Sequence, residues 1–163
     1  MSPSLHIKAA LITDGLMLDY VDNGLEGGSS FNEKMIGAPA TGEGLQQWLK
    51  RSPSFNLDKV NAALMVVGEG PASLLYMWHP YAGLHYLKKP VDVVMLNTDE
   101  HTLTNPAVRM ASQGGSVDWF RFWLQGYEDP DPAKAEQYKR WRGLRELQAE
   151  NEKKSTAAQA SSH

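Results

Sequence analysis

The sequence predicts an α/β fold with a three-stranded parallel sheet flanked by helices, and three apolar runs carry this prediction. Residues 7–12, 62–67 and 91–96 are short and aliphatic, and each is followed by a polar turn. Such runs are typical of buried strands. Helical segments separate them, and strands that alternate with helices usually form parallel sheets. Three strands are few for this class, so we expect part of the usual sheet to be missing.

The turns that follow the three runs are rich in glycine and acidic residues. They are Thr13-Asp14-Gly15, Gly68-Glu69-Gly70-Pro71 and Asn97-Thr-Asp-Glu100. Glycine and aspartate favour turns, so each strand is predicted to end at its turn.

Helices are predicted between the strands. Residues 43–50 form an amphipathic pattern that Ser52-Pro53 ends, and glycines and serines within residues 24–30 predict a flexible turn before it. Residues 73–87 also fit a helix. Pro80 should weaken this helix, which therefore is expected to begin nearer Trp78.

The last third of the chain is predicted to be helical. Gly114-Gly115 should interrupt a first segment, and Ser116 should cap a short aromatic helix over residues 117–124. Asp131 and Pro132 fit the N-cap and first position of a long charged helix that runs to about Lys154. Residues 155–163 are small and polar, which predicts a disordered tail.

Composition and charge exclude several classes of protein. The 163 residues suffice for one domain with a real core. A net charge of −3 offers no nucleic-acid footprint, and the absence of cysteine excludes disulfides and thiolate metal sites. No apolar run is long enough to span a bilayer, so no membrane partner is expected. The first residues lack a signal-peptide pattern, which predicts a cytoplasmic location for the chain as written.

A histidine beyond the third strand is the first candidate for chemistry. The turn over residues 97–100 leads to His101, at the edge where parallel sheets place functional residues. Imidazole ionises near neutral pH, so His101 is either a proton carrier or a loop residue without a role. Asp14 follows the first strand in the same way, either as a site carboxylate or as a cap for the next segment.

Neither a metal nor another cofactor is predicted. His79 and His85 are not spaced as i,i+4, so they would not share a helical face, and no recognised ligand spacing includes them. Gly27-Gly28-Ser29 is not a phosphate loop, because the Lys-Ser/Thr ending and the preceding strand are both absent.

Three blocks of sequence carry a family resemblance. They are Lys89-Pro-Val-Asp-Val-Val-Met-Leu96, His101-Thr-Leu-Thr-Asn-Pro-Ala-Val-Arg109 and Ser112-Gln-Gly-Gly-Ser-Val-Asp-Trp-Phe-Arg-Phe-Trp-Leu-Gln-Gly126. On these blocks the chain resembles the C-terminal part of the catalytic domain of prolyl oligopeptidase-type serine peptidases. The resemblance runs from Ile7 to about Lys154. It implies a partial α/β-hydrolase fold over residues 1–154 and hydrolysis of peptide bonds through an acyl-enzyme.

The same resemblance implies roles for individual residues. His101 matches the catalytic base, which takes the proton of a serine hydroxyl and returns it to the leaving amine. The family's acid lies in the turn that matches Gly68–Ser73, so Glu69 is the favoured acid and Asp14 is the second candidate. The chain departs from the family because it contains no nucleophile elbow of the form G-x-S-x-G.

Three hypotheses follow from the absent elbow. The first is a piece of a peptidase that is inactive alone and acts on peptides when a nucleophile-bearing segment completes it. The second is a non-catalytic remnant that acts as an interaction module. The third is an unrelated hydrolase with Ser112 or Ser116 as nucleophile. Because the strand beside residues 7–12 would carry the elbow, we also expect an edge strand there, through which the chain self-associates.

Overall fold

Three parallel strands form the centre of the molecule. The computed structural model describes residues 7–15, 17–25 and 30–160. Within them the strands are β1 (Ala9–Thr13), β2 (Ala63–Glu69) and β3 (Val91–Leu96), in the order β1-β2-β3. Both pairings are parallel. The predicted class and the predicted parallel strands are therefore confirmed.

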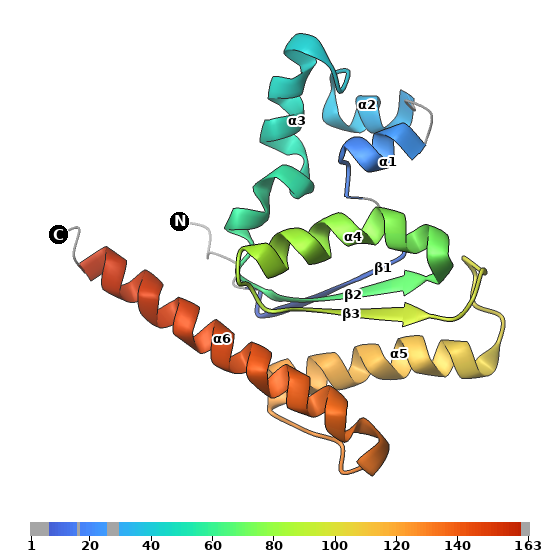
Figure 1. Ribbon diagram of the computed structural model, residues 1–163, viewed down its shortest axis with the longest axis vertical. Helices are drawn as coiled ribbons and strands as arrows, with labels where there is room; N and C mark the ends of the chain where they lie inside the picture. Colours follow the sequence, from blue (N-terminus) through green and yellow to red (C-terminus); the bar gives the residue numbers. More distant parts are fainter. Residues whose placement is uncertain (1–6, 16, 26–29, 161–163) are drawn as a thin grey trace.

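Helices cover both faces of this sheet. Helix α4 (Gly70–Tyr86) lies on one face, and α5 (Pro106–Phe120) and α6 (Ala135–Ala160) lie on the other (Figure 1). The connection from β1 to β2 contains three further helices, which stand beyond α4 in Figure 1. They are α1 (Tyr20–Leu25), α2 (Ser30–Ile36) and α3 (Leu45–Arg51). Short helical turns complete the chain: η1 (Gly42–Gly44), η2 (Pro53–Lys59), η3 (Arg121–Gln125) and η4 (Pro132–Lys134).

The central strand β2 separates two hydrophobic cores. Side chains alternate along a strand, so successive residues of β2 point to opposite faces. Met65 and Val67 pack with aromatic residues of α5, η3 and α6. Leu64 and Val66 pack instead with Met77 and other residues of the α4 side. Residues 63–68 are all buried, which explains why this strand is continuously apolar in the sequence.

Four aromatic residues dominate the core below β2. Trp119, Phe122, Tyr138 and Trp141 are buried. Trp141 meets Trp119 and Tyr138 edge to face, and Phe122 makes tilted ring contacts with Tyr138 and Trp141. The Trp119 indole Nε1 donates a hydrogen bond to the Ala10 carbonyl at 3.0 Å. The aromatic residues predicted to form a short helix near the C-terminus are therefore part of the core. A buried indole needs a polar partner for Nε1, and Trp119 has one here.

Tertiary packing overrides two predicted helix interruptions. Helix α4 runs continuously from Gly70, so the predicted start near Trp78 is wrong, although Pro80 lies inside the helix. Met77 and Leu84 bury one face of α4 on the sheet, and this burial outweighs a single missing hydrogen bond. Helix α5 likewise continues through Gly114-Gly115. Ser116 is consequently not a cap.

The predicted cap at Asp131 is present. Asp131 accepts a hydrogen bond from the Ala133 N–H at 2.9 Å, and Pro132 is at the first helical position.

The helices differ from the sequence prediction in two further places. Helix α6 continues beyond Lys154 to Ala160, so the predicted tail is helical up to that residue, and residues 161–163 lie outside the described residues. Gly24 lies in α1, whereas residues 26–29 of the predicted flexible turn lie outside the described residues. No helix in the described ranges is both long and apolar enough to cross a membrane.

Strand β1 pairs on one side only within the described part of the chain. The Lys8 carbonyl accepts from the Ala63 N–H at 3.1 Å, and the Asp14 N–H donates to the Val67 carbonyl at 3.0 Å. In a parallel ladder, the backbone groups of every second residue face the same neighbour. The N–H and C=O groups of Ala9, Leu11 and Thr13 therefore face away from β2.

We expect Trp119→Phe to lower the free energy of unfolding by about 1.5–3 kcal/mol, because it removes a buried hydrogen bond and leaves a cavity. Urea unfolding followed by circular dichroism measures this change. Trp78→Phe is the matched control, since Trp78 is 55% exposed, and it should change stability by less than about 0.5 kcal/mol. Equal losses in the two variants would contradict the structural role of Trp119.

Candidate active site

The three residues singled out by sequence meet at one edge of the sheet. Asp14 directly follows β1, Glu69 is the last residue of β2, and His101 lies in the loop after β3. The carboxyl ends of parallel strands share one edge, which explains the meeting of three residues far apart in the sequence. Asp14 has a left-handed backbone with φ of 42°, a conformation that aspartate tolerates better than most residues.

The histidine contacts one carboxylate directly and lies near the other. His101 Nδ1 forms a short hydrogen bond with Asp14 Oδ2. Glu69 Oε2 lies 3.9 Å from the same nitrogen, which is beyond hydrogen-bond reach. The side chain of His101 is 83% exposed, whereas that of Glu69 is only 5% exposed. The structure thus places Asp14 against the imidazole and Glu69 beneath the pair.

The surroundings of Asp14, Glu69 and His101 shift the pKa of each of these groups. Burial disfavours ionisation of Asp14, but the Ser73 hydroxyl and His101 outweigh it and hold the pKa of this carboxyl below its ordinary value. The hydrogen bond to Asp14 and the charge of Asp14 raise the pKa of His101. Burial raises the pKa of Glu69, and the negative charge of Asp14 adds to this effect. The two carboxyl groups therefore differ, because the pKa of Asp14 is lowered and that of Glu69 is raised.

A glycine allows the loop that carries His101 to approach the end of β2. Gly70 has φ of 85°, and a Cβ atom at this position would lie 2.1 Å from the Thr98 carbonyl oxygen. Only glycine fits such a close approach of two backbones. The loop is also held locally, because the Glu100 carboxylate accepts from the Thr104 N–H at 2.8 Å. The Gly68–Pro71 turn thus positions both Glu69 and, through Thr98, the histidine loop.

A cleft opens beside His101, between this loop and helix α5. Ser112 and Ser116, the alternative nucleophiles, line the same cleft. The Ser116 hydroxyl donates to the Ser112 carbonyl at 2.7 Å, so it is engaged with its own helix. Further lining residues are Thr13, Glu69, Thr102, Leu103, Arg109 and Gln113.

His79 and His85, the other histidines within the described ranges, have protein partners. His79 Nδ1 pairs with Asp19 Oδ2 at 2.6 Å, and His85 packs on Tyr81 with ring centroids 6.0 Å apart. In the described part of the chain, ligand-type atoms of Asp14, Glu69 and His101 lie within 4.8 Å of one another. Two of these atoms, His101 Nδ1 and Asp14 Oδ2, are in direct contact with each other.

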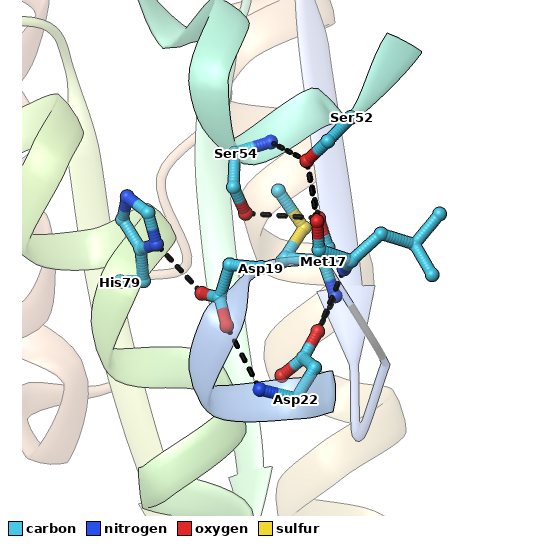
Figure 2. Close-up of polar contacts among 7 residues, drawn as sticks. Met17, Asp19, Asp22, Ser52, Ser54 and His79 are labelled. Atoms are coloured by element: carbon cyan, nitrogen blue, oxygen red, sulfur yellow. Dashed lines mark hydrogen bonds and ion pairs between the residues drawn. The ribbon is translucent and has the colours of Figure 1, made fainter. Parts of the chain in front are cut away.

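A buried polar network that no sequence pattern indicated fixes the chain just after β1 (Figure 2). Asp22 Oδ2 accepts from the backbone N–H groups of Met17 and Leu18 at 2.6 and 2.7 Å. The hydroxyl of Ser54 donates to the Met17 carbonyl at 2.9 Å. Asp19 accepts from the Asp22 N–H and binds His79 of α4, which ties this segment to the helix. The network therefore anchors the segment that follows Asp14.

Comparison with known proteins gives the family context. No family model matches the chain. Over 67 residues it is 43% identical to the lasso peptide isopeptidase AtxE2 of Asticcacaulis excentricus, and this match covers 41% of the chain and 10% of that relative. The resemblance to prolyl oligopeptidase-type serine peptidases is confirmed. The chain corresponds to a small part of the relative it matches.

Two solved structures of AtxE2 isopeptidase share the fold. The apo form matches with a TM-score of 0.57 and 29% identity, covering 77% of this chain and 18% of that one. A serine-to-alanine variant with astexin3-dC4 bound matches with a TM-score of 0.56 and 34% identity, covering 62% of this chain and 15% of that one. The three-stranded sheet and its helices are thus a partial α/β-hydrolase fold.

We expect the pKa of His101 to lie above 6.5 in the wild-type chain and to fall towards that value in Asp14→Asn, which removes the negative partner. NMR titration of the imidazole Cε1 proton measures it. Glu69→Gln is the matched control and should shift this pKa much less, because Asp14 makes the direct contact. An unchanged pKa in Asp14→Asn would contradict the observed pairing.

The same shifts give the pH range in which the pair stabilises the fold. The contribution of His101, whose pKa is raised, is complete below pH 6.5 and is lost as the pH rises through the folded-state pKa. The contribution of Asp14, whose pKa is lowered, is present above pH 3.8 and is lost as the pH falls through its folded-state pKa. The stability difference between wild type and Asp14→Asn should therefore be largest between these limits.

Proposed function

We propose that this chain supplies the general base and its acid partner to a serine-type peptidase or isopeptidase site. The observation that carries the proposal is the contact between His101 and Asp14 at the carboxyl edge of a parallel sheet. A histidine oriented through Nδ1 by a carboxylate keeps Nε2 for proton transfer. The similarity to an isopeptidase supports this assignment, although the match covers only 10% of that relative.

In the proposed mechanism the serine comes from a segment that these 163 residues do not include. Nε2 of His101 takes the proton of the serine hydroxyl as its oxygen attacks the peptide carbonyl carbon. The imidazolium then gives this proton to the nitrogen of the leaving amine as the C–N bond breaks. Asp14 holds the imidazole in the required orientation and stabilises its positive charge. The isolated chain should be inactive, because a base without a nucleophile forms no acyl-enzyme.

The proposed substrate is a peptide or isopeptide. Support comes from the related AtxE2 isopeptidase, whose solved variant has astexin3-dC4 bound. A lasso peptide is the narrower hypothesis within this class.

A chimera tests the proposal. The segment of AtxE2 that matches this chain would be replaced by residues 7–160, and cleavage of a lasso peptide would be followed by mass spectrometry. We expect activity in the chimera and a loss of at least about 100-fold in kcat in His101→Ala, because general-base catalysis contributes roughly that much. Asp14→Asn should lower kcat as well. The isolated chain should take no specific label from a fluorophosphonate probe.

A matched variant separates loss of chemistry from loss of folding. His85→Ala changes an exposed histidine of α4 whose contact is a ring of its own helix, and it should retain activity. A folded chimera that stays fully active with His101→Ala would overturn the proposal. A stoichiometric fluorophosphonate adduct on the isolated chain would overturn it too, and would favour Ser112 or Ser116 as nucleophile.

The side of β1 that faces away from β2 is a candidate interaction surface. This surface also supports the alternative function, a non-catalytic interaction module. Ile7 is 57% exposed beside this strand. An apolar groove adjoins it and is lined by residues of β1, η2 and β2, including Ile12, Met17 and Leu57. Free backbone groups next to apolar surface are a template for a further strand. We propose that a nucleophile-bearing segment or a second copy of the chain occupies this edge.

We expect the purified chain to self-associate in sedimentation velocity across a concentration series. Leu11→Pro should reduce association, because proline removes an N–H that faces the open side and is tolerated on edge strands. Leu75→Glu changes the exposed face of α4 instead. It is the control and should have no effect on association. A monomer at every concentration would refute the edge interaction.

A further inference from the structure

One arginine in the cleft beside His101 lacks a partner. Arg109 lines this cleft, and its guanidinium forms no hydrogen bond, ion pair or ring contact with the described residues. Each other arginine is engaged with a protein group: Arg51 with the Ile36 carbonyl, Arg121 with the Tyr127 ring, Arg140 with Asp92, Arg142 with Glu128, and Arg145 with the Phe122 carbonyl. An unpaired guanidinium in a cleft is a ready site for an anion.

The helix places Arg109 among uncharged polar groups. Arg109, Ser112, Gln113 and Ser116 are spaced i, i+3, i+4 and i+7 along α5, so they share one face, and all of them line the cleft. Ser112 is buried, and its carbonyl accepts from Ser116. The wall opposite the histidine loop therefore offers one positive charge together with hydroxyl and amide groups.

Neither Glu69, which lines the cleft, nor the neighbouring Asp14 forms an ion pair with this charge. Asp14 is paired with His101, and the buried carboxyl of Glu69 lies beside that pair rather than in an ion pair with Arg109. The positive charge on this wall is thus left for a group from outside the chain.

We propose that Arg109 binds a carboxylate of the peptide substrate and thereby holds the peptide beside His101. The proposal rests on the function proposed above for its substrate class. A carboxylate fits because guanidinium donates two parallel hydrogen bonds to it. The group could be the C-terminus of the peptide or an acidic side chain, and the two sources share the same chemistry.

NMR titration of the ¹⁵N-labelled full chain tests this proposal. The probes are acetyl-Ala-Ala-Ala-Ala with a free C-terminus, acetyl-Ala-Ala-Asp-Ala-amide, and the neutral acetyl-Ala-Ala-Ala-Ala-amide. At least one acidic peptide should shift the Arg109 Nε–H and His101 signals with an affinity at least about tenfold above that of the neutral peptide. Whichever acidic peptide binds more tightly identifies the source of the carboxylate.

Variants make the result specific to Arg109. Arg109→Gln should abolish the preference for acidic peptides, and Arg109→Lys should retain part of it. Arg142→Gln is the matched control, because it removes the same charge from α6, and it should keep the preference. His101→Ala should also keep it, so that binding is judged separately from the catalytic role. Equal binding of all three peptides, or an equal loss in Arg142→Gln, would overturn the proposal.

Discussion

The burial of β2 on both faces is the constraint on which the rest of the molecule depends. A strand covered on both sides must be continuously apolar, and it holds two cores together through alternate side chains. Because β1 and β3 both pair with it in parallel, their carboxyl ends emerge at the same edge. The meeting of Asp14, Glu69 and His101 follows from this pairing and not from any local motif. Packing on β2 therefore supports both stability and the geometry of the site.

Much of this architecture could be predicted from sequence, and the failures have a common cause. The three strands were evident because apolar, β-branched runs separated by turns have few other solutions. The helix breaks expected at Pro80 and at Gly114-Gly115 did not occur, since burial against the sheet outweighs local propensity. The network around Asp19 and Asp22 had no signature, because its members contact backbone groups and residues distant in the sequence.

The sequence could place the carboxylates at the site but could not rank them. Both Asp14 and Glu69 follow strands, and the matching turn of the family favoured Glu69. What distinguishes them is local: the left-handed backbone of Asp14 brings its side chain to Nδ1 of His101, whereas Glu69 is buried beneath. Two carboxyl groups this close in a poorly solvated place resist joint ionisation. In the proposed function, the carboxylate of Asp14 orients the imidazole and Glu69 supports Asp14.

The position of this cluster also limits where a nucleophile can come from. Asp14 follows β1, one of the two edge strands of the described sheet, so the histidine loop reaches over the end of β2 to the margin of the sheet. Helix α5 and its polar face bound the cleft on one side, and the end of β2 lies beneath it. The imidazole is largely exposed, which leaves room above it for a reacting group. In the proposed function, the serine that meets His101 approaches across β1, from the side where the backbone groups of Ala9, Leu11 and Thr13 face away from β2. The proposed edge interaction and the proposed completion of the site would thus use the same side of β1, which is unpaired within the described part of the chain.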